Sequence, residues 1–138
     1  MLTGSCLCGR LAYEADAEID GVIHCHCETC RKAHGAAFSS LAAVPRERFR
    51  WISGEEVRKS FESSPGKLRH FCSECGSQLV AERTGAPNIM LRLGGLDTPI
   101  QAERQWHIWR SDGASWYDPS VVLPELPEGF VAAKAAPR

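Results

Sequence analysis

Apolar side chains along this chain recur in short runs that Gly, Pro and Ser interrupt, and such runs are typical of β-strands. They predict eight strands, over residues 10–15, 22–27, 38–44, 49–52, 57–61, 67–72, 78–81 and 89–93. One short helix is expected over residues 28–34, directly after a strand. Because closely spaced strands without long helices between them favour hairpin connections, we expect a mainly β fold of antiparallel sheets.

The length of 138 residues suits one domain, and 43% hydrophobic side chains are enough for one ordinary core. A chain of this size buries roughly two-thirds of its unfolded surface on folding, so it does not need disulfides to compensate for a missing core. We expect a single domain over residues 1–130. The alanine-rich residues 131–138 are expected to form a flexible C-terminal tail.

Charged side chains of the two signs are nearly balanced, with 16 basic against 17 acidic residues and a formal net charge of −1. This balance gives no strong field that would attract nucleic acid or an anionic membrane surface, so we expect neither as a partner. Apolar stretches fall short of the roughly 18 residues of a membrane span, and the N-terminus lacks the pattern of a secretory signal. These features predict a cytoplasmic protein.

All seven cysteines lie in three tight clusters. In chain order, the clusters hold Cys6 and Cys8; Cys25, Cys27 and Cys30; and Cys72 and Cys75. In a reducing compartment, cysteines at such spacings are more often metal ligands or catalytic groups than disulfides. Two cysteines two apart on a strand point to the same face, and a Cys-x-x-Cys turn directs both sulfurs toward one point. Both arrangements therefore suit a tetrahedral metal ion.

Zinc takes four ligands in a structural site but keeps an open position beside three protein ligands in a catalytic site, so seven thiolates divide naturally as four plus three. The middle cluster lies within six consecutive residues, which makes it the candidate open site. The outer clusters then form a structural four-thiolate site that closes a loop of about 64 residues, with a closure entropy of about 4 kcal/mol. An alternative joins two middle cysteines with one outer pair and leaves the other pair without metal.

Several motifs of the chain occur in the same order in the glutathione-dependent formaldehyde-activating enzyme family, which also includes centromere protein V. They are GSCLCG over residues 4–9, HCHCETCRKAHGA over 24–36, SSPG over 63–66, FCSECG over 71–76, GGLD over 94–97 and HIW over 107–109, followed by Trp116 and Pro127. The chain resembles this family. The resemblance implies an Mss4-like zinc-containing β fold, a structural zinc on the outer two cysteine pairs and a catalytic zinc on the central three cysteines.

Three thiolates give the central zinc complex a net negative charge, so the ion acidifies bound water less than one held by three histidines. A thiolate-rich zinc instead accepts a fourth sulfur and holds it as a thiolate at neutral pH. The resemblance implies the particular reaction, the formation or release of S-hydroxymethylglutathione. The sequence therefore predicts a carbon–sulfur lyase with two Zn²⁺ per chain that acts on glutathione or a related small thiol. The alternative is a non-catalytic, zinc-stabilised binding module.

Side chains close to the middle cluster supply the other candidates for this chemistry. Arg31 and Lys32 directly follow the last ligand and are expected to bind the carboxylates of glutathione. His26, Glu28 and His34 are the candidate proton carriers, because of their chemistry and their proximity in the sequence. His26 alternates with two cysteines along the predicted strand, so it should face the opposite side.

Three of the four tryptophans lie late in the chain, at Trp106, Trp109 and Trp116. Trp106 and Trp109, in the segment WHIW over residues 106–109, either wall a pocket or fill the core. Because an aromatic side chain gains a large free energy on burial, the sequence favours the core.

Overall fold

The computed structural model describes residues 1–130. Within them the chain forms ten strands, one α-helix and four 3₁₀ turns, joined by loops. A three-stranded sheet has the order β1-β2-β5, and a seven-stranded sheet has the order β10-β3-β4-β9-β8-β7-β6. The elements are β1 (Leu2–Ser5), β2 (Ala12–Ala15), β3 (Val22–Cys25), α1 (Glu28–His34), β4 (Ser39–Pro45), η1 (Arg46–Arg48), β5 (Phe49–Ser53), η2 (Glu55–Val57), β6 (Arg58–Ser64), β7 (Lys67–Cys72), β8 (Gln78–Arg83), β9 (Asn88–Arg92), η3 (Leu93–Gly95), β10 (Gln105–Ile108) and η4 (Arg110–Asp112).

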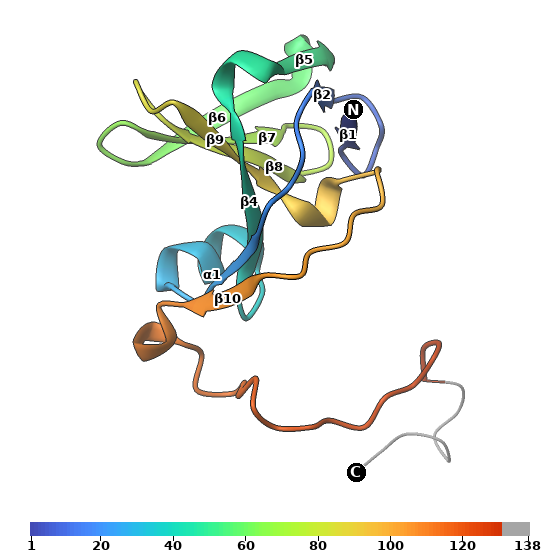
Figure 1. Ribbon diagram of the computed structural model, residues 1–138, viewed down its shortest axis with the longest axis vertical. Coiled ribbons are helices and arrows are strands. Elements are labelled where there is room, and N and C mark those ends of the chain that lie inside the picture. Colours follow the sequence, from blue (N-terminus) through green and yellow to red (C-terminus); the bar gives the residue numbers. More distant parts are fainter. Residues whose placement is uncertain (131–138) are drawn as a thin grey trace.

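The expectation of a mainly β fold with one short helix is confirmed, and α1 coincides with the predicted residues 28–34. The sequence pattern did not predict two of the strands, β1 and β10. β1 is only four residues long with a single large apolar side chain, and β10 is exposed along its whole length. The expectation of purely antiparallel sheets is wrong at one place, where β10 pairs with β3 in parallel. Residues 96–104 carry the chain back across the fold before β10, as a parallel pairing requires (Figure 1).

The main hydrophobic core joins the two sheets. It contains side chains from β2, β4, β8 and β9, among them Tyr13, Val44, Leu79 and Leu91. Two cysteines of the outer clusters, Cys6 and Cys72, belong to the same core. A second, smaller cluster forms around the middle cysteines. Each group of cysteines therefore sits on a packed hydrophobic base that limits its freedom to move.

Helix α1 is short, and its two ends are set by specific residues. The side chain of Cys27 caps the N-terminus by accepting a hydrogen bond from the backbone N–H of Cys30 at 3.3 Å. Gly35 ends the helix in the left-handed region at φ 57, and its N–H donates to the carbonyl of Arg31. Because Cys27 and Cys30 are tied together by the cap, local helix geometry fixes two of the three middle cysteines.

The late tryptophans do not fill the core, so this expectation is wrong. Trp106, Trp109 and Trp116 are 48%, 62% and 69% exposed. The reason is that β10 is an edge strand whose four residues are all exposed, and that the chain after η4 leaves the body of the domain in an extended path (Figure 1).

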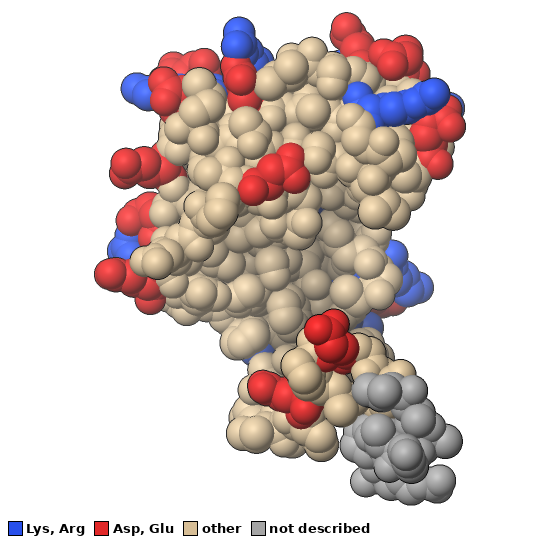
Figure 2. Space-filling model, turned by 90° about the vertical axis from the view of Figure 1, so that its right-hand side faces the viewer, with Lys and Arg blue, Asp and Glu red and all other residues tan. Residues whose placement is uncertain are grey.

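Residues 131–138 lie outside the described part of the chain, so the flexible tail and the domain limit at residue 130 stay predictions. Among the described residues, no helix is long and apolar enough to cross a membrane. Figure 2 shows one face of the molecule, on which the basic side chains of the described residues lie near the edge, acidic side chains lie both at the edge and in the middle, and no continuous basic patch forms.

Candidate metal centres

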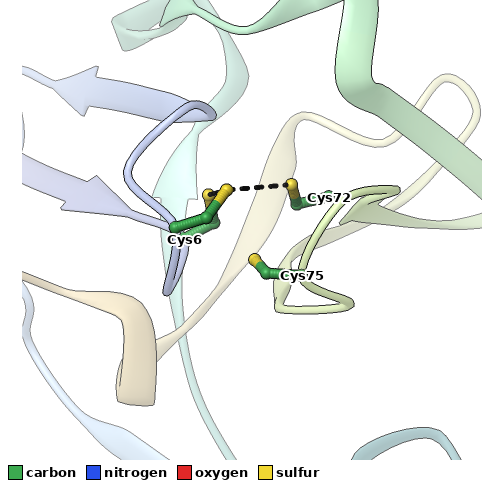
Figure 3. A group of neighbouring side chains, drawn as sticks. Cys6, Cys72 and Cys75 are labelled. Carbon is green, nitrogen blue, oxygen red and sulfur yellow. Dashed lines mark hydrogen bonds between the residues drawn. The ribbon is translucent and has the colours of Figure 1, made fainter.

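The outer four cysteines converge from two loops that lie far apart in the sequence. Cys6 and Cys8 follow β1, whereas Cys72 ends β7 and Cys75 lies in the turn before β8. All four sulfurs lie within 4.8 Å of one another, with 3.5 Å between Cys6 and Cys8 and 3.8 Å between Cys8 and Cys72. Sulfurs placed ~2.3 Å from one tetrahedral ion are about 3.8 Å apart, so the spacing fits zinc. Figure 3 shows Cys6, Cys72 and Cys75 directing their sulfurs toward a common centre.

Tight turns, rather than strand geometry, bring the members of each outer pair together. Gly9 and Gly76 each adopt a positive φ, 81 and 79, which closes the turn after the cysteines. The N–H of Gly9 donates to the carbonyl of Cys6 at 3.0 Å, and the N–H of Gly76 donates to that of Cys72 at 2.7 Å. The expected strand alternation therefore does not apply to Cys6 and Cys8, which lie in a turn.

The middle three cysteines form a second group, with all three sulfurs within 4.8 Å of one another. Cys25 is the last residue of β3, Cys27 is the cap of α1 and Cys30 lies one turn into the helix. No other His, Cys, Asp or Glu of residues 1–130 joins this group. The seven sulfurs are therefore arranged as four plus three, and both sets of soft thiol donors are of the kind that zinc prefers.

The middle thiols experience opposing electrostatic effects. Burial raises the pKa of Cys25 to about 12. Burial also opposes ionisation of Cys30, but contacts with Ser39, Cys27 and Arg69 outweigh it and lower the pKa of this thiol to about 7. The guanidinium of Arg69 lies 3.9 Å from the sulfur of Cys30. The thiol of Cys30 therefore ionises more readily than an ordinary cysteine thiol.

A cavity of about 510 Å³ opens beside the middle cysteines, within the ~300–1,000 Å³ range of small-molecule sites. Cys25, Cys27 and Cys30 all line it. Its apolar wall includes Ile23, Leu41, Met90 and the exposed Trp109. Its polar wall carries four cationic side chains and one carboxylate, which are Lys67, Arg69, Arg83, Arg92 and Asp112. The cavity is thus suited to a small anionic ligand next to three thiols.

Arg31 and Lys32, the expected glutathione anchors, are placed elsewhere and do not line this cavity. Arg31 donates to the carbonyl of His26 at 3.3 Å and to the carbonyl of Asp112 at 3.0 Å, so it braces the loop that carries the middle cysteines. Lys32 is exposed and lies 3.5 Å from Glu28 in a helical ion pair.

The three candidate proton carriers also lie outside the cavity. His26 is only 1% exposed and bonds through Nε2 to Nδ1 of His107 at 2.8 Å. Glu28 has an exposed side chain, and its backbone N–H donates to Asp112 at 2.7 Å. His34 lines a different cavity, of about 540 Å³. His26 lies beyond the end of β3 at Cys25, so the strand alternation expected for it does not apply, and its direction is set by the bond to His107.

The pH dependence of stability should report the burial of His34. Burial, followed by the charges of Arg92 and Arg69, lowers the pKa of His34 to about 4. Because the folded pKa lies below the unfolded value of about 6.5, this histidine stabilises the fold fully above pH 6.5 and loses that contribution as the pH falls toward 4. We expect His34→Gln to reduce the acid-induced loss of unfolding free energy by about 1 kcal/mol. The effect stays this small because solvent reaches part of His34 and screens its charge.

The measurement is urea unfolding of both proteins at pH values between about 7.5 and 4.5. Protonation of the cysteines affects both proteins alike, so the difference between their plots of unfolding free energy against pH isolates the contribution of His34. Plots that stay parallel over this range would contradict a lowered pKa of His34.

The sequence did not predict the four cationic residues of the cavity, because they come from β7, β8 and β9, far from Cys25, Cys27 and Cys30 in the chain. A signal was present at Arg92, which stands between Leu91 and Leu93 at the end of an apolar strand. Arg69 similarly lies inside a strand that ends on a ligand cysteine. A charged residue inside an apolar strand is unusual because burying the charge is costly.

The family model described as glutathione-dependent formaldehyde-activating enzyme matches residues 1–112. The chain belongs to this family. Proteins with similar sequences include an "Uncharacterized lyase" of Schizosaccharomyces pombe, 31% identical over 85 residues that cover 62% of this chain and 60% of the relative. A "Putative glutathione-dependent formaldehyde-activating enzyme" of Fusarium vanettenii is 28% identical over 82 residues, covering 59% of this chain and 44% of the relative.

The chain thus spans about half the length of the curated relatives it matches, between 44% and 60% for these two. A crystal structure of a Rhodobacter sphaeroides protein, solved as a structural genomics target, has a TM-score of 0.58 and 21% identity. The alignment covers 75% of this chain and 98% of that protein. This likeness shows that the fold of this chain also occurs in an experimental structure.

Proposed function

We propose that this chain is a zinc-dependent carbon–sulfur lyase that joins glutathione to formaldehyde or releases it from the adduct. In this proposal the four outer cysteines hold a structural zinc, and Cys25, Cys27 and Cys30 hold a catalytic zinc. Zinc bound by these three cysteines supplies a soft Lewis-acid position at which a ligand sulfur stays ionised at neutral pH. The observation that carries the proposal is that three convergent thiols line a cationic cavity in a chain of this family.

The cavity residues position the reactants and shield them from water. Ile23, Leu41 and Met90 form an apolar wall beside the thiols, which strengthens electrostatic interactions within the cavity. In the forward direction, the glutathione thiolate gives an electron pair to the carbonyl carbon, the carbon–sulfur bond forms as the π bond of the carbonyl breaks, and the oxygen that receives those electrons takes one proton. The reverse direction breaks the same bond and returns the proton.

Lys67 is best placed to donate that proton, because it lines the cavity and the three candidates from the sequence do not. Burial, followed by the charges of Arg69 and Arg92, lowers the pKa of its ammonium group. A lowered pKa makes the ammonium a stronger acid near neutral pH. Lys67 therefore replaces His26, Glu28 and His34 as the proposed proton carrier.

A non-catalytic binding module would need the chain itself to complete the coordination of the middle site. Residues 1–130 place three donors there and no fourth one, whereas the outer site has four. This difference favours a site that is open to a ligand sulfur over a module whose two ions are both purely structural.

Reconstitution under reducing conditions tests both the metal count and the open position. We expect two zinc ions per chain, one for each cysteine group. After replacement of zinc by Co²⁺, glutathione should increase the thiolate-to-cobalt absorption, because a fourth sulfur joins the middle site. Catalysis is measured as the rate of S-hydroxymethylglutathione formation by NMR. A count of one ion, or a cobalt spectrum that glutathione leaves unchanged, would refute the proposal.

A further inference from the structure

Most basic side chains of the described residues have an acidic partner on the surface. Eight of them form ion pairs with Asp or Glu, namely Arg10, Lys32, Arg46, Arg48, Arg50, Arg58, Arg104 and Arg110. The four cationic side chains that line the thiol cavity form none with any carboxylate among residues 1–130. Unpaired positive charge is therefore concentrated at this cavity.

Two of these four cations are almost fully buried. Arg69 is 3% exposed and Arg92 is 4% exposed. Arg69 donates from Nε to Ser63 at 2.9 Å, but its Nη1 has no hydrogen-bond partner. Nη2 of Arg92 likewise has none. The Cys30 sulfur lies 3.9 Å from Nη2 of Arg69, yet each of the two guanidinium groups keeps one buried nitrogen without an acceptor. Burying a charged donor without an acceptor is unfavourable, so the two free nitrogens on one cavity wall point to an anion that binds there.

The cysteines alone do not supply enough negative charge to balance this wall. Three thiolates with one Zn²⁺ carry a single net negative charge, and Asp112 adds one more. The four cations exceed these by two positive charges. Glutathione bound through its thiolate carries two carboxylates, one ammonium and one thiolate, which leaves two net negative charges. The ligand and the cavity wall therefore complement each other in charge.

We infer that Arg69 and Arg92 form a carboxylate-binding subsite, so that the thiol bound beside the middle cysteines must itself carry a carboxylate. This inference rests on the proposed function for the position of the thiol. The free N–H groups of Arg69 and Arg92 are directional donors that bind a carboxylate in the fixed geometry of a guanidinium. Arg31 and Lys32 have no part in the subsite, since the first braces a loop and the second pairs with Glu28.

The first test compares ligands on the wild-type zinc-loaded protein by isothermal titration calorimetry. Glutathione has both a thiol and carboxylates, glutathione diethyl ester keeps the thiol without them, and S-methylglutathione keeps the carboxylates without the thiol. We expect glutathione to bind about 10- to 100-fold more tightly than the diethyl ester, as charge-assisted hydrogen bonds provide. Equal affinity for glutathione and its diethyl ester would overturn the inference without any variant.

The second test repeats the titrations with Arg69→Met and Arg92→Met, and with Arg69→Lys in case the apolar variants fold poorly. Zinc content and circular dichroism verify each fold. We expect glutathione affinity to fall about 10- to 100-fold while affinity for the diethyl ester changes less than about threefold. Arg48→Met is the matched control, because Arg48 is exposed, pairs with Asp16 and lies outside the cavity. Equal losses for glutathione and diester would assign the arginines to support of the cysteines and would overturn the inference.

The ligand series separates failure of this inference from failure of the proposed function. If S-methylglutathione binds in an arginine-dependent manner and the thiol adds nothing, the subsite stands and the zinc–thiolate proposal falls. If both thiols bind the middle site equally and S-methylglutathione does not bind, the thiol proposal stands and the carboxylate subsite falls.

Discussion

Replacement of Cys72 by serine is expected to unfold the domain or to lower its free energy of unfolding by about 4 kcal/mol or more. Cys72 is fully buried in the main core and lies 3.8 Å from the sulfur of Cys8, 64 residues earlier in the chain. In the proposed structural site, loss of one ligand would release the metal ion and with it the crosslink between the two loops. Such a loss is a large part of the ~5–15 kcal/mol that stabilises an ordinary domain.

Thermal unfolding followed by circular dichroism, together with zinc content, measures this effect. A chelator that removes both ions from the wild-type protein should bring its melting temperature close to that of Cys72→Ser. If the variant retains two zinc ions and melts with the wild type, the outer cysteines are not a structural metal site.

Replacement of Cys27 by serine should have the opposite balance of effects, with little loss of stability and loss of thiol binding. Serine is a favoured N-cap residue, and its hydroxyl can accept the hydrogen bond that Cys27 now accepts from the N–H of Cys30. Helix α1 should therefore persist, at a stability change of about 1 kcal/mol or less. The middle site keeps only two sulfurs, so we expect glutathione affinity and catalysis to fall on the order of 100-fold.

The two serine variants control each other, because the same chemical change is made in each cysteine group. Zinc content should fall by one ion in each, and glutathione titration of Cys27→Ser measures the loss of thiol binding. Comparable melting temperatures in Cys27→Ser and Cys72→Ser would reject the division into a structural and a catalytic site. Unchanged glutathione binding in Cys27→Ser would reject the thiol-binding role of the middle site.

The local spacing of cysteines determined most of what the sequence could predict. Cys25, Cys27 and Cys30 lie within one strand end and one helical turn, so their convergence follows from short-range geometry. The pairing of the outer clusters was predicted by ligand counting, because seven cysteines match the four ligands of a closed zinc site together with the three of an open one. The short apolar runs similarly predicted eight strands and α1, since strand and helix periods are local properties.

Tertiary structure alone decided which side chains meet the middle cysteines. Arg69 and Arg92 reach the cavity only because β7 and β9 join the same seven-stranded sheet as β3, through the pairings of β8 and β4. Arg31 and Lys32 are neighbours of Cys30 in the chain, yet the direction of the helical turn points them to a loop and to solvent. The sequence therefore determined the two cysteine groups, because the middle three cysteines are neighbours in the chain and the outer four follow from counting metal ligands. The charge of the cavity depends on the pairing of β4 with β9, which brings strands far apart in the chain side by side and which local sequence patterns do not specify.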